Sequence, residues 1–91
     1  MIWVTTYKIK PHLSKEQRRE LLDTFAEKGA APGTTAHYVA ADGSHGVTVA
    51  DTDDVAGLYR TVQTYAEWIE FDSKVMLDVT ESVPITMEAI S

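Results

Sequence analysis

The sequence predicts one α+β domain whose elements follow the order β-α-β-β-α-β, and three observations lead to this prediction. The chain has 91 residues, which is enough for one domain and too few for two. Stretches rich in β-branched and aromatic residues alternate with two stretches of helical period. One tight-turn signal, at residues 42–46, lies in the middle of the chain. We therefore expect residues 1–91 to form a single domain, with 84–91 as a short C-terminal tail.

The first half of the chain supplies a strand and a helix. Residues 2–9 are rich in β-branched and aromatic side chains, which favour a half-buried pleated surface, and Pro11 ends this run. Ser14 is suited to cap a helix, because Gln17 three residues later completes a capping box. Gly29 is suited to end that helix, and the Pro-Gly pair that follows enforces a break.

The second half supplies a hairpin and a second helix. Strands are expected at 34–41 and 47–50, on either side of the turn. Thr52 or Asp53 is expected to cap the next helix, because acids are favoured at the positive N-terminal end of a helix. Apolar side chains then recur at intervals of three and four as far as Ile69, which is the clearest helical stripe in the chain.

A fourth strand is expected at 74–80, where apolar and polar residues alternate, and Pro84 ends it. With one hairpin between two right-handed crossovers, the order predicts a ferredoxin-like fold. In that fold a four-stranded antiparallel sheet carries both helices on one face. The other face of the sheet stays open unless something else covers it.

The hairpin decides which side chains face the helices. We place its loop at 42–45. Directly opposed residues share a face, so Tyr38, Val47 and Val49 are then expected to pack under the helices. A loop one residue longer would invert every assignment. The open face is expected to carry Ile2, Val4, Val39, Ala50 and Met76, with Thr6, His37, Thr48 and Asp78 among them.

Such a mixture of apolar and polar side chains is typical of an interface or a ligand cavity. His37 is the first candidate for a catalytic base or a ligand anchor, because its charge changes near neutral pH. The alternative is a histidine held by a hydrogen bond at a dimer interface. Asp78 is the second catalytic candidate, as a carboxylate that orients a histidine. The alternative is that it lies at the solvent-exposed end of its strand. The candidate ligand-binding residues are Thr6, Thr48, Met76 and Trp68, of which Trp68 either covers a pocket mouth or packs in the core.

Composition excludes several classes of function. The formal charge is −6, so a nucleic-acid backbone or an anionic membrane would be repelled. The chain has no cysteine, which excludes disulfides, thiolate metal sites and cysteine nucleophiles. A cytoplasmic location is expected, because so small an extracellular domain would usually contain disulfides. The three histidines share no ligand spacing, so no metal site is expected. No nucleotide-binding or serine-hydrolase motif is present, and no cofactor is expected.

Several stretches resemble the dimeric α/β-barrel superfamily, and within it a small bacterial domain family of unknown function. The matching stretches are 7–11, 41–44, 46–54 and 68–71, in this order and spacing. The resemblance implies a homodimer in which the open sheet faces line a shared barrel. Relatives include cofactor-free oxygenases, haem-degrading enzymes, lactone isomerases and plain ligand-binding domains. Where these families lead us to expect a histidine before the hairpin, this chain has Val39, and His37 lies two residues earlier.

Three functional hypotheses follow. The first is a homodimer that binds a small apolar or aromatic molecule in the barrel cavity; if it is an enzyme, it is a cofactor-independent one of monooxygenase or isomerase type. The second is a dimerisation or scaffold domain without catalytic activity, whose open face exists only to pair. The third, ranked lowest, is a haem-binding or haem-degrading protein that uses His37 as its ligand.

Overall fold

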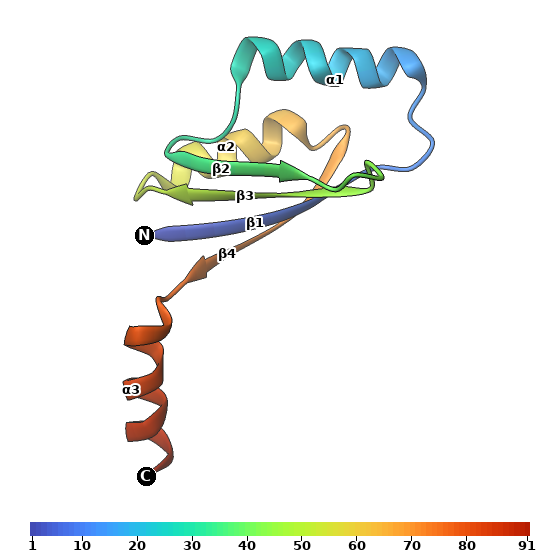
Figure 1. Ribbon diagram of the computed structural model, residues 1–91. Coiled ribbons are helices and arrows are strands. Elements are labelled where there is room, and N and C mark those ends of the chain that lie inside the picture. Colours follow the sequence, from blue (N-terminus) through green and yellow to red (C-terminus); the bar gives the residue numbers. More distant parts are fainter.

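Four strands and three helices make up the computed structural model, which describes residues 1–91 (Figure 1). The strands form one antiparallel sheet in the spatial order β2-β3-β1-β4. The predicted ferredoxin-like order is confirmed, with a third helix added after the last strand. The elements are β1 (Ile2–Ile9), α1 (Lys15–Lys28), β2 (Thr34–Val39), β3 (His45–Asp51), α2 (Val55–Tyr65), β4 (Ile69–Met76) and α3 (Val79–Ile90).

Local sequence chemistry explains how α1 and α2 begin. Ser14 caps α1 and Gln17 closes the predicted capping box, because each side chain accepts a hydrogen bond from the other residue's backbone N–H. At α2 the cap is Asp54, whose carboxylate accepts from the Gly57 N–H at 2.9 Å. The prediction of Thr52 or Asp53 as this cap was wrong by one or two residues. Thr52 instead accepts a hydrogen bond from the Asp54 N–H at 3.0 Å and so shapes the turn before the cap.

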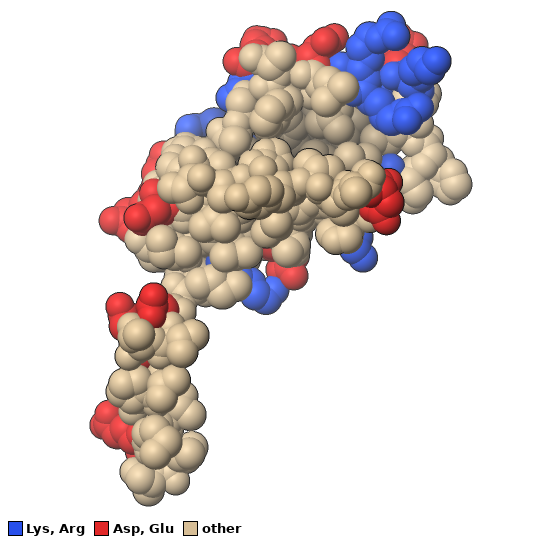
Figure 2. Space-filling model, viewed as in Figure 1, with Lys and Arg blue, Asp and Glu red and all other residues tan.

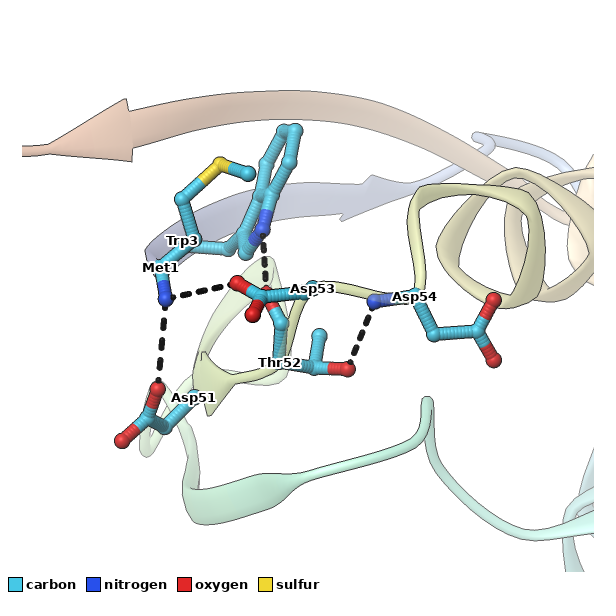
Figure 3. A network of polar contacts seen from close by, with 6 residues as sticks. All are labelled: Met1, Trp3, Asp51, Thr52, Asp53 and Asp54. Carbon is cyan, nitrogen blue, oxygen red and sulfur yellow. Dashed lines mark hydrogen bonds and ion pairs between the residues drawn. The ribbon is translucent and has the colours of Figure 1, made fainter.

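A small polar network ties the start of β1 to the segment after β3 (Figure 3). The Met1 ammonium group lies 3.1 Å from the Asp53 carboxylate and 3.5 Å from that of Asp51. The Trp3 indole N–H donates to the backbone carbonyl of Thr52 at 3.2 Å. The hydrogen bond with Asp53 raises the pKa of the ammonium group above its ordinary value. These contacts fix the end of the sheet from which α2 departs.

The two faces of the hairpin are the reverse of the prediction. The predicted loop at 42–45 was wrong, because Val39 pairs with Gly46 and Tyr38 with Val47, a register shifted by two residues. A shift of two keeps each side chain on its face, so the expected sets of side chains still share faces. However, His37 packs against Phe25 of α1, with ring centroids 5.8 Å apart, and therefore faces the helices. The physical reason is Gly46, which pairs with Tyr7 and leaves the space that the Tyr7 ring fills on the helix side. Val39, Thr48 and Ala50 alternate in step with these residues and also face the helices, whereas Tyr38, Val47 and Val49 face the open side.

The last strand ends earlier than predicted, and the C-terminal tail is helical. β4 pairs with β1 from Ile69, opposite Ile9, to Met76, opposite Ile2. Because β1 begins at Ile2, the strand has no partner beyond Met76, so the prediction of a strand at 74–80 was wrong. The residues predicted to finish that strand begin α3 instead, and Pro84 lies inside the helix rather than ending a strand.

The core is small and lies between α1, α2 and one end of the sheet. Its buried side chains are Leu21, Tyr65 and Trp68. The Tyr65 hydroxyl donates to the backbone carbonyl of Gly29 at 2.7 Å, which joins the end of α2 to the end of α1. The radius of gyration is 15.9 Å, against about 12 Å for a compact domain of this length, because α3 runs away from the sheet (Figure 1). None of the helices is both long and apolar enough to cross a membrane.

Candidate functional site

A cavity of about 340 Å³ lies between the sheet and the two helices that cover it. Its walls come from all four strands and from α1 and α2, and none of the lining side chains is Asp, Glu, Lys or Arg. The polar atoms that reach it belong to hydroxyl groups and imidazole rings. The lining residues are Thr5, Tyr7, Ile9, Leu21, Leu22, Phe25, Gly29, Ala30, Ala31, His37, Val39, His45, Thr48, Leu58, Thr61, Val62, Tyr65, Ile69, Phe71 and Ser73.

Tyr7 and His37 form the strongest polar contact in this cavity. The Tyr7 hydroxyl oxygen lies 2.6 Å from Nε2 of His37. The rings of Phe25 and Phe71 pack beside this pair, with centroids 5.8 Å from His37 and 6.1 Å from Tyr7 respectively. Aromatic contacts of this kind restrict ring rotation, so the two polar groups keep their relative position.

Burial acts on the proton of the Tyr7 hydroxyl. It raises the pKa of this hydroxyl above its ordinary value, so the hydroxyl keeps its proton at neutral pH. The Tyr7 hydroxyl can therefore donate to Nε2 of His37 in the tautomer that carries its proton on Nδ1. Nδ1 has no hydrogen-bond partner within the chain, and His37 is exposed, so this nitrogen is open to a bound molecule.

The sequence-predicted site residues separate into three places. His37 and Thr48 line the cavity as direct neighbours across β2 and β3. Thr6 and Met76 lie on the open face, as expected, and do not line the cavity. The remaining two candidates belong to neither group: Trp68 is buried in the core and Asp78 caps α3.

The placement of Asp78 corrects the prediction of a carboxylate inside the barrel. Its side chain accepts hydrogen bonds from the Thr80 backbone N–H at 2.8 Å and from the Thr80 hydroxyl at 2.7 Å. These bonds lower the pKa of the Asp78 carboxyl below its ordinary value. Because Asp78 is an exposed helix cap, it does not orient His37.

Trp68 differs from the other candidates because it is almost fully buried. It packs with Leu21 and Tyr65, and its indole N–H is buried without a hydrogen-bond partner. It does not line the helix–sheet cavity. The structure therefore places it among the packing residues rather than at a pocket mouth.

Sequence reasoning missed Tyr7 as the partner of His37, and with it Thr5, Phe25 and Ser73 as lining residues. One signal was available. Gly46 is the only residue without a side chain in the third strand, and a large aromatic residue opposite a glycine can lie across it. That pairing identifies the helix side of the hairpin once the register of β1 against β3 is known.

No group of three or more His, Cys, Asp or Glu side chains is placed to hold a metal ion. The fold and the cavity together define an α+β domain of ferredoxin-like type with a helix–sheet pocket. The family described as "Domain of unknown function (DUF3303)" matches residues 1–90, and the chain belongs to this family. The resemblance to a domain family of unknown function is thereby confirmed. Comparison with curated proteins gives no match.

Proposed function

We propose that this domain binds a small, uncharged, apolar or aromatic molecule in the helix–sheet cavity, with the Tyr7–His37 pair as its polar anchor. The observation that carries the proposal is an apolar cavity in which Tyr7 and His37 form a short hydrogen-bonded pair. Its volume of about 340 Å³ lies at the lower end of the range of roughly 300–1,000 Å³ that is usual for small-molecule pockets. This proposal puts the site on the helix side of the sheet, whereas the sequence suggested a barrel cavity between two open faces.

The lining argues for an uncharged ligand. A buried charge is unfavourable unless an opposite charge or several hydrogen bonds meet it, and no Asp, Glu, Lys or Arg side chain lines this cavity. Most of the wall is aliphatic or aromatic, which favours a flat apolar body. His37 and Thr48 lie side by side and both can hydrogen-bond, so one hydroxyl or carbonyl group on the ligand is accommodated there.

The same pair supports a cofactor-independent reaction as the catalytic form of this proposal. A ligand hydroxyl placed on the Tyr7 oxygen transfers its proton to that oxygen while the Tyr7 proton moves to Nε2 of His37. The products are a ligand oxyanion and an imidazolium, so charge and protons balance. An enolate or phenolate made in this way is the reactive species that an isomerase or a cofactor-free oxygenase requires.

A three-ligand titration tests the binding proposal. We choose 2-naphthol as a neutral flat probe with one hydroxyl, naphthalene without it, and 2-naphthoate as the charged analogue. We expect 2-naphthol to bind most tightly and 2-naphthoate not to bind. A lost hydrogen bond is worth about 0.5–1.5 kcal/mol, so His37→Ala should weaken 2-naphthol binding by roughly 2- to 12-fold and leave naphthalene unchanged.

Two substitutions on one helix locate the site. Thr61 lines the cavity, whereas Thr64, one turn further along α2, does not. Thr61→Phe fills the cavity and should abolish 2-naphthol binding, and Thr64→Phe should leave it intact. Equal binding by both variants, or the absence of binding to the unmodified protein, would rule out the proposal and favour the scaffold hypothesis.

We also propose that the open face of the sheet pairs with the same face of a second copy. Most of this face is aliphatic and aromatic, apart from Thr6 and Lys8 of β1, and β4 borders it with Glu70, Asp72 and Lys74. An apolar centre with a polar rim is the usual arrangement of a protein interface. Its apolar side chains are Ile2, Val4, Ala36, Tyr38, Val47, Val49 and Met76.

A further inference from the structure

α3 carries an apolar stripe that contacts nothing in its own chain. Val79, Val83, Met87 and Ile90 follow one another at helical spacing on one side, and each has more than half of its surface exposed. All side-chain hydrogen bonds of α3 stay within residues 78–91. The helix runs away from the end of β4 and from the other two helices (Figure 1).

A helix with this sequence needs a surface to pack against. It has 12 residues, which is marginal for an isolated helix in water. Its β-branched residues have low helix propensity, and Pro84 removes one backbone hydrogen bond from its interior. Local propensity therefore does not account for α3, and tertiary or quaternary packing of its stripe does.

The exposed surface area is too large for a chain that remains alone. The chain exposes 6656 Å², whereas a compact monomer of 10.1 kDa exposes about 5,300 Å². The excess of roughly 1,400 Å² is larger than the about 800 Å² that each partner contributes to a standard protein interface. An interface between two copies of this chain would bury an area of about this size on each copy.

The apolar surface of α3 is continuous with the open face of the sheet. Met76 lies on that face at the end of β4, Leu77 follows with 60% of its surface exposed, and Val79 begins the stripe of α3. A partner seated on the open face therefore borders the arm. The far side of α3 carries Glu81 and Glu88 and no base, so an anionic membrane is not a suitable surface for it.

Charge also favours a second copy of this chain. Lys15, Arg18 and Arg19 form a basic group on α1 that makes no ion pair in the chain. Figure 2 shows this group at one end of the molecule and the acidic, base-free α3 at the other. Within one chain the two regions lie at opposite ends, so their opposite charges can meet only between two molecules.

We infer that α3 is an arm that packs its apolar stripe against a second copy of this chain and so completes the homodimer. The inference rests on the proposed pairing of open faces and adds the arm to it. The contact occurs twice in a two-fold dimer, so one substitution in the stripe removes two contacts.

Sedimentation equilibrium of the full chain and two variants tests the arm. Val83 lies in the stripe, and Ile85 lies on the opposite side of the same helix, with 52% and 57% of their surfaces exposed. We expect Val83→Asp to weaken dimerisation at least tenfold and Ile85→Asp to change it by less than about threefold. Far-UV circular dichroism should show loss of helix in Val83→Asp at concentrations where that variant is monomeric.

The outcomes separate the arm from the pairing of the sheets. A dimer that Val83→Asp does not weaken would overturn the role of α3 and leave the sheet interface standing. A dimer that Ile85→Asp disrupts equally would overturn the assignment of the stripe. An unmodified chain that is monomeric at all concentrations would overturn both the pairing of open faces and the arm.

Discussion

The sheet face that the helices cover encloses a hollow, whereas the face that no helix covers is flat. The face under α1 and α2 carries Tyr7, His37 and Thr48 around a hollow of about 340 Å³. The face without any helix carries a flat aliphatic centre that includes Val4 and Val49, which are direct neighbours. The covered face thus encloses a hollow, whereas the uncovered face presents a flat apolar centre. An apolar hollow with a few polar groups suits a small ligand, whereas a flat apolar surface with a polar rim suits another sheet.

The largest effect is expected where the covered face is packed most tightly. Leu21 is buried in the core, and its neighbour Leu22 has 67% of its surface exposed. Leu21→Ala should lower the free energy of unfolding by about 2–5 kcal/mol, because it removes buried methyl groups and leaves a void. Leu22→Ala should change it by less than about 0.5 kcal/mol. Urea denaturation measures both, and equal effects would mean that α1 does not pack on the sheet through Leu21.

The open face should respond in association rather than in folding. Val49→Asp places a charge at the centre of that face, where the proposed partner sheet would bury it, and should weaken dimerisation at least tenfold. Tyr59, with 66% of its surface exposed on α2, provides the control. Tyr59→Asp should leave the sedimentation mass unchanged. A dimer that tolerates Val49→Asp would show that the open face is not the interface.

A smaller effect tests the polar pair of the cavity. Tyr7→Phe removes the hydroxyl that lies 2.6 Å from His37, and should lower the free energy of unfolding by about 0.5–1.5 kcal/mol. Tyr38 is on the open face with 70% of its surface exposed, so Tyr38→Phe is the matched control and should have no effect in the monomer. If the two substitutions have the same effect in urea denaturation, the bond from Tyr7 to His37 contributes nothing to stability.

The sequence predicted the local features of this protein better than it predicted which face of the sheet each side chain occupies. The Ser14–Gln17 capping box and the order of the first six elements depend on neighbouring residues, and both were confirmed. The side on which His37 lies depends on the space above Gly46, which is set by a strand far away in sequence. The assumption that the more apolar side faces the helices failed in the hairpin, because its more apolar side chains, Tyr38, Val47 and Val49, lie on the open face.

The end of the chain was unpredictable for a different reason. Pro84 and the surrounding β-branched residues argue against a helix, and β4 ends at Met76, opposite Ile2, where its pairing with β1 ends. Neither fact can be obtained from the segment itself. The sequence contains the cap of α3, Asp78 followed by Thr80, but not the second copy that we propose as its packing surface.

The smallest expected effect is the pH dependence of that cap. Hydrogen bonds from Thr80 lower the pKa of Asp78 in the folded state, so its contribution to stability is present above the ordinary aspartate pKa and is lost as the pH falls through the lowered value. We expect the helical signal of α3, measured by far-UV circular dichroism, to decrease in this acid range. Asp78→Asn keeps a capping side chain without the charge, so its signal should lack this step. A step that persists in Asp78→Asn would assign the transition to another carboxylate and leave the arm without a pH-sensitive cap.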